Sequence, residues 1–85
     1  MNIFKKIPFT HDDERYEIRI FYDDETINIA AFTNNYPANG FRYQIKIPKK
    51  VNVEKLLNLD NFREFIEMSK IDIIENRWEK FKALF

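Results

Sequence analysis

The chain has 85 residues, with 14 basic and 14 acidic side chains, one glycine and no cysteine. This length supports one hydrophobic core, so we expect a single domain over residues 1–85. The balanced charge excludes a global field that would attract nucleic acid or an anionic membrane, and the lack of cysteine excludes disulfides, thiolate catalysis and cysteine-bound zinc.

The start of the chain, MNIFKK, lacks the long apolar region of a signal peptide. No later stretch approaches the ~20 apolar residues of a membrane span. We therefore expect a cytoplasmic protein that has no membrane segment. Nine Phe, four Tyr and one Trp supply much of the apolar area, so the expected core is rich in aromatic rings.

The first segment, residues 2–9, is predicted to be a short edge strand. Ile3, Ile7 and Phe9 would lie on one side of it. Pro8 favours the edge of a sheet, because proline cannot donate to an interior hydrogen-bond ladder. The polar residues 10–13 that follow predict a turn.

Three further segments, residues 14–22, 26–33 and 41–48, alternate apolar and polar side chains with a period of two, which predicts strands with one buried face. Pairing Tyr22 with Ile27 places all apolar residues of the first two on one face. A slip of one residue would bury charged side chains instead.

The third strand is expected to return through a seven-residue loop, residues 34–40. That loop sets Ala31 opposite Tyr43 and Ile27 opposite Ile47. A two-residue hairpin at Asn39-Gly40 is rejected, because it would set apolar residues opposite lysines.

After Pro48 the apolar spacing becomes helical, which predicts helices at residues 53–58, 61–69 and 73–84. Asn52, Asn61 and Asp72 are the expected N-terminal capping residues. We expect a break at residues 69–72, because the stripe of Phe62, Phe65 and Ile66 lies more than a quarter turn from that of Ile74, Trp78 and Phe81. Trp78 and Phe81 are predicted core residues.

Strands followed by helices indicate an α+β fold. The expected architecture is a two-layer sandwich, in which an antiparallel meander of three or four strands carries two or three C-terminal helices on one face. The other face of the sheet is left without a helix, and the outward-pointing side chains of the strands form its surface.

That helix-free face is the main candidate site, because two phenylalanines lie on it among cations, with Glu17 as the single acid. The predicted binding residues are Arg15, Arg19, Phe21, Phe32, Arg42, Gln44 and Lys46. We expect them to bind a protein partner or a second copy of the chain as a homodimer. The alternative is single-stranded nucleic acid, with bases on the rings and phosphates on the cations. Isolated surface phenylalanines are also ordinary.

A second candidate is a polar rim at one end of the sheet, where two turns are expected to lie close together. Its residues are His11, Asp12, Asp13, Asn35 and Tyr36. They could bind a small ligand or a divalent cation. The competing interpretation is a pair of solvated turns, because Asp and Asn favour turns for backbone reasons.

No catalytic residues are predicted. The chain has no nucleophile beside a base and no glycine-rich phosphate loop, and its single histidine has no evident partner. We therefore expect a non-enzymatic interaction domain without a metal or cofactor.

Overall fold

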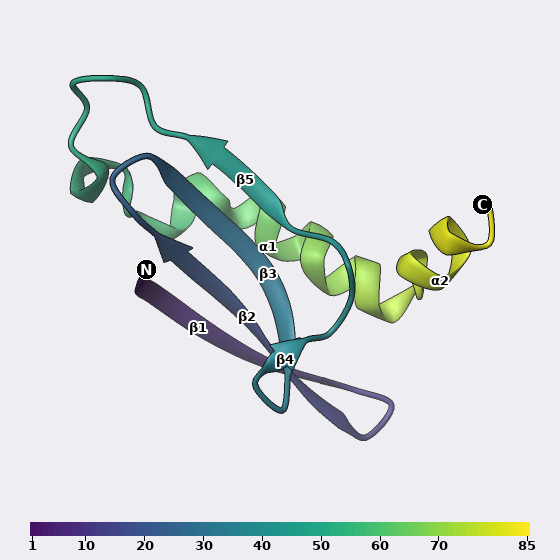
Figure 1. Cartoon of the computed structure of the whole chain (residues 1–85). Helices are drawn as coiled ribbons and strands as arrows, with labels where there is room; N and C mark the ends of the chain where they lie inside the picture. The colour runs from purple at the N-terminus through teal and green to yellow at the C-terminus, as the bar shows by residue number, and fades with distance from the viewer.

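The computed structural model describes residues 1–85 and has two layers, a five-stranded antiparallel sheet and a helical layer against one face (Figure 1). The predicted α+β class is confirmed. The strands are β1 (Asn2–His11), β2 (Glu14–Tyr22), β3 (Thr26–Thr33), β4 (Tyr36–Pro37) and β5 (Tyr43–Lys46). The helical elements are the 3₁₀ turn η1 (Val53–Leu56) and the helices α1 (Leu59–Ile74) and α2 (Arg77–Lys82).

The centre of the sheet has the predicted register. Tyr22 lies opposite Ile27, and Ile18 lies opposite Ala31. The isoleucines of β2 and β3 therefore point to one face, where Phe62 and Ile66 of α1 cover them. These side chains are buried and form the hydrophobic core.

Strand β1 differs from the prediction at its start. A bulge between Ile3 and Lys5 leaves Phe4 as the extra residue. Phe4 consequently packs toward the core, with its ring centroid 6.2 Å from that of Phe62. The prediction that Ile3 lies on the same side as Ile7 is wrong, because Ile3 is paired with the outward residue Phe21.

The register of β5 also differs from the prediction, by two residues. Ile27 lies opposite Ile45 and Ile29 opposite Tyr43. Asn34 and Asn35 both adopt positive φ, 50° and 65°, and form a tight turn that pairs β4 with the end of β3. Residues 38–42 then lie outside the strands, and β5 pairs with β3 only from Tyr43 onward. A shift of two residues leaves each side chain on the same face of the sheet, so the apolar side chains of β5 still face the core.

The helix boundaries are corrected at both ends of α1. Asn58, rather than Asn61, caps α1 by accepting a hydrogen bond from the Asp60 amide at 2.9 Å. The helix passes through the predicted break and ends at Ile74, before Asn76, whose φ is 52°. Asp72 is therefore a buried residue inside α1 and not a cap. Asn52 caps η1 as expected.

The prediction that Trp78 and Phe81 belong to the main core is wrong. Helix α2 has no buried residue, and its rings pack instead against Phe41 from the loop before β5, at centroid distances of 5.2 Å and 6.0 Å. Gly40 lies directly beneath Trp78. No helix in the structure has both the length and the apolar character that a membrane span requires.

Candidate interaction surface on the sheet

The face of the sheet opposite α1 carries no helix (Figure 1). Because side chains alternate along a strand, the residues between the core isoleucines of β2 and β3 point to this face. Arg19 and Phe21 of β2 thus lie opposite Ala30 and Asn28 of β3. The same alternation places Phe32 opposite Glu17.

Two rings and two guanidinium groups form the centre of this face, which we call the ring–arginine cluster (Arg19, Phe21, Phe32 and Arg42). The Phe21 and Phe32 rings meet edge to face with centroids 6.2 Å apart. The Arg19 guanidinium lies 4.4 Å from the Phe32 centroid, and the Arg42 guanidinium lies 5.8 Å from that of Phe21. The four side chains come from β2, β3 and the residue before β5, so the sheet itself holds them together.

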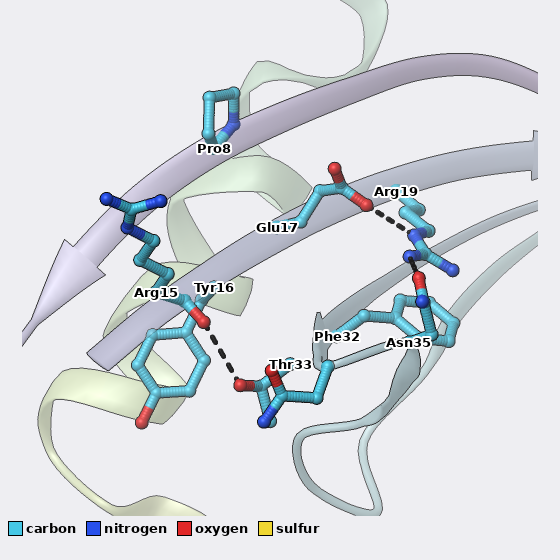
Figure 2. A pocket seen from close by; sticks show the side chains of 9 residues that line it. Pro8, Arg15, Tyr16, Glu17, Arg19, Phe32, Thr33 and Asn35 are labelled. Atoms are coloured by element: carbon cyan, nitrogen blue, oxygen red, sulfur yellow. Dashed lines mark hydrogen bonds and ion pairs between the residues drawn. The ribbon is translucent and has the colours of Figure 1, made fainter.

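Arg19 is fixed by two polar partners (Figure 2). Its Nε donates to the Glu17 carboxylate at 2.6 Å, and its terminal nitrogen donates to the Asn35 side-chain oxygen at 2.7 Å. These residues line a hollow of about 270 Å³, with Arg15 on its far side. The charge of Arg19 is thereby paired with an acid, and its guanidinium is held against the Phe32 ring.

An apolar hollow adjoins the ring–arginine cluster. Met1, Ile3, Phe21 and Phe32 line it together with Arg19. Ile3 is 51% exposed, although it lies beside two large rings. The sequence-based prediction missed Ile3 because the bulge at Phe4 reverses its side. The only signal was the adjacent apolar pair Ile3-Phe4, of which a strand must turn one member outward.

The other predicted binding residues lie around the cluster. Gln44 Nε2 donates to Asn28 Oδ1 at 3.0 Å, and Asn28 is fully buried. Gln44 therefore satisfies a buried amide as well as facing outward. Lys46 lies further along, opposite Thr26, and Arg15 lies near the opposite end of the face.

The predicted polar rim is divided between two hollows. His11 and Asp12 share one with Ile73, Ile74 and Asn76, at the end of α1. Asn35 instead belongs to the hollow beside Arg19.

The remaining rim residues lie on turns. Tyr36 is exposed on β4, and Asp13 occupies the β1–β2 turn with a φ of 64°. In Figure 1 that turn extends beyond the β3–β4 turn. His11 Nε2 lies 3.4 Å from an Asp12 carboxylate oxygen, and no group of three or more metal-ligating side chains forms anywhere in the chain.

A polar network that the sequence did not indicate lies at the edge of the core. The Tyr43 hydroxyl of β5 donates to the buried Asp72 carboxylate of α1. An Arg77 nitrogen at the start of α2 lies 3.5 Å from the same carboxylate. Burial, followed by the hydrogen bond to Asp72, raises the pKa of Tyr43 to about 12.

The geometry thus defines a small two-layer α+β domain, with a ring–arginine cluster on the uncovered face of its sheet. Comparison with known proteins adds no relative, since no family model, curated protein or solved structure matches the chain.

Proposed function

We propose that this protein is a small non-catalytic domain that binds another protein through the helix-free face of its sheet. The observation that carries the proposal is the apolar hollow beside the ring–arginine cluster, where Met1 and Ile3 are exposed next to Phe21 and Phe32. Exposed apolar side chains gathered around large rings are typical of interaction sites.

The charge around the hollow indicates the chemistry of the partner. Five cations share this face with one acid, Glu17. They are Lys6, Arg15, Arg19, Arg42 and Lys46. A partner with an apolar centre and an acidic rim would complement both features.

Binding across the face is favoured over addition of a strand to the sheet edge. The sheet has two open edges. The first is β1, which carries Lys5, Lys6 and Pro8 and contains the bulge at Phe4, and the second is formed by β4 and β5, which are only two and four residues long. Lysines, proline and bulges are the features with which natural proteins prevent strand addition. The partner would therefore contact side chains of this surface and not the backbone of the edge.

Single-stranded nucleic acid is the second candidate, and the excess of cations on this face favours it. Two contacts argue for a protein instead. Arg19 already covers the Phe32 ring, and its charge is engaged by Glu17 and Asn35. A base would have to displace that guanidinium before it could stack on Phe32.

The test uses a photo-reactive amino acid at position 3, with position 36 as the matched control. Both side chains are exposed, but only Ile3 adjoins the ring–arginine cluster. We expect a protein to cross-link at position 3 and not at position 36. The purified partner should then bind Ile3→Asp and Arg42→Glu at least about ten-fold more weakly than the unaltered chain, as for central interface residues.

A titration with single-stranded oligonucleotides at two salt concentrations separates the alternatives. Tight binding that weakens steeply with salt would favour nucleic acid. A cross-linked protein whose affinity is unchanged by both variants would show that the proposed surface is wrong.

A further inference from the structure

A second uncovered surface lies at the C-terminal end of the structure, in residues 77–85, and is separate from the helix-free sheet face (Figure 1). The rings of Trp78, Phe81 and Phe85 follow one another at centroid distances of 5.7 Å and 5.1 Å. Phe41 packs against the first two, yet Phe81 remains 43% exposed and Phe85 92% exposed. Leu84 beside them is 78% exposed.

The side of α1 that faces away from the sheet carries a further exposed row of side chains, which we call the outer α1 groove. Its residues are Asp60, Arg63, Glu64, Glu67, Met68 and Ile71. Their spacing of three and four residues places them on one side of the helix. Met68 is exposed, and Ile74, one turn beyond Ile71, is also exposed. The groove thus has an apolar end near Ile74 and an acidic end near Asp60.

The two surfaces are complementary in charge. The outer α1 groove has three acids and one base, a net charge of −2, whereas residues 77–85 have three bases and one acid, a net charge of +2. Glu64 in the groove and Lys80 on α2 form no ion pair within their own chain. Both surfaces also leave apolar side chains exposed, Leu84 and Phe85 on one and Met68 on the other.

We infer that the C-terminal segment, residues 77–85, packs into the outer α1 groove of a second copy of this chain. Its own groove is out of reach, because only two residues, Glu75 and Asn76, separate α1 from α2, and α2 is held in place by Phe41. In a two-fold dimer each copy would donate its C-terminal segment to the other, so the contact would occur twice and the assembly would close. Lys80 would lie toward the acidic end of the groove, and Phe81, Leu84 and Phe85 toward its apolar end.

The test is the mass of the full chain measured by sedimentation equilibrium from micromolar to millimolar concentration. We expect a monomer–dimer equilibrium that weakens as salt screens the charges. The double variant Leu84→Asp with Phe85→Asp should weaken dimerisation at least about ten-fold. Both side chains are almost fully exposed, so the variant should fold normally, which circular dichroism would verify.

A charge exchange tests the pairing itself. Glu64→Lys and Lys80→Glu should each weaken dimerisation about three-fold at low salt, and the two changes in one chain should restore it. Lys55→Glu is the matched control, because Lys55 is exposed in η1, outside both surfaces, and should leave the equilibrium unchanged.

A chain that stays monomeric to millimolar concentration would overturn the inference, as would a dimer that is insensitive to Leu84→Asp with Phe85→Asp. The variant Ile3→Asp should not affect dimerisation, because Ile3 lies on the sheet face. Loss of the dimer in Ile3→Asp would place the second copy on that face and show the inference to be wrong. Failure of either surface is thus distinguishable from failure of the other.

Discussion

At the scale of single residues, the buried carboxylate of Asp72 depends on side chains from two other elements. Asp72 is buried inside α1. Its carboxylate accepts a hydrogen bond from the Tyr43 hydroxyl of β5 and faces Arg77 of α2. A buried carboxylate without partners would destabilise the fold by several kcal/mol. The network therefore links three elements through one carboxylate.

Replacing Tyr43 by Phe should destabilise the protein by about 1–3 kcal/mol, because Asp72 loses its only hydroxyl donor while remaining buried. Thermal unfolding followed by circular dichroism would measure the change. Tyr22→Phe is the matched control, since Tyr22 is partly buried and its hydroxyl has no partner in the chain. Equal losses in the two variants would contradict a stabilising role for the Tyr43–Asp72 bond.

The raised pKa of Tyr43 predicts how stability changes in alkali. The folded chain holds the Tyr43 proton up to about pH 12, whereas an unfolded tyrosine releases it near 10. Between these values the unfolded state binds fewer protons, so the free energy of unfolding falls as pH rises. Burial and the hydrogen bond to Glu14 also raise the pKa of Tyr16, so ultraviolet titration should show more than one tyrosine that ionises late. The Tyr43→Phe variant should lack the last step.

At the scale of elements, the sequence predicts the register of β2 with β3 well and the register of β5 poorly. A one-residue slip between β2 and β3 would bury Glu17 and Arg19, and the predicted register, with Tyr22 opposite Ile27, is the observed one. A two-residue slip of β5 preserves every buried face. Its register depends instead on the turn at residues 34–35 and on residues 38–42 between β4 and β5. The alternation of side chains reveals neither the positive φ values of the turn nor the length of that connection.

The same distinction applies to the candidate site. Alternation along β2 and β3 was sufficient to bring Arg19, Phe21 and Phe32 together in the prediction, and their rings and guanidinium are in contact in the structure. Ile3 was missed because a bulge adds one residue to β1 and reverses the side that its neighbours face. Bulges depend on tertiary packing, here that of Phe4 on Phe62.

Docking of α2 depends on the only glycine of the chain. A Cβ atom at position 40 would lie 2.2 Å from the Trp78 ring, so Gly40→Ala must displace that ring. We expect a loss of about 1–3 kcal/mol, as for overpacking elsewhere. A shift in the fluorescence of Trp78, the only tryptophan, should accompany it.

The double-mutant cycle with Trp78→Leu supplies the control. Once the indole is absent, Gly40→Ala should cost much less, because the added methyl group no longer meets the ring. If the cost is the same in both backgrounds, the glycine is required for a reason other than its contact with Trp78.

At the scale of the whole molecule, burial is distributed unequally between the centre and the C-terminal end. The core lies between β2, β3 and α1, whereas α2 contributes no buried side chain. Local opening is easiest where few apolar groups are buried, so α2 should open without unfolding of the sheet. In the dimer inferred above, the exposed side of this segment would gain contacts with the second copy, which would add to the few contacts that hold α2 in its own chain.

Amide hydrogen exchange on a dilute sample would test this distribution. We expect amides of β2 and β3 to exchange with nearly the full free energy of unfolding, and amides of α2 to exchange much faster. Raising the protein concentration should then slow exchange in α2 and on the outer face of α1, because the inferred dimer covers both, while β2 and β3 remain unchanged. Protection of α2 equal to that of β3 in the dilute sample would contradict independent opening, and protection that is independent of concentration would contradict the dimer.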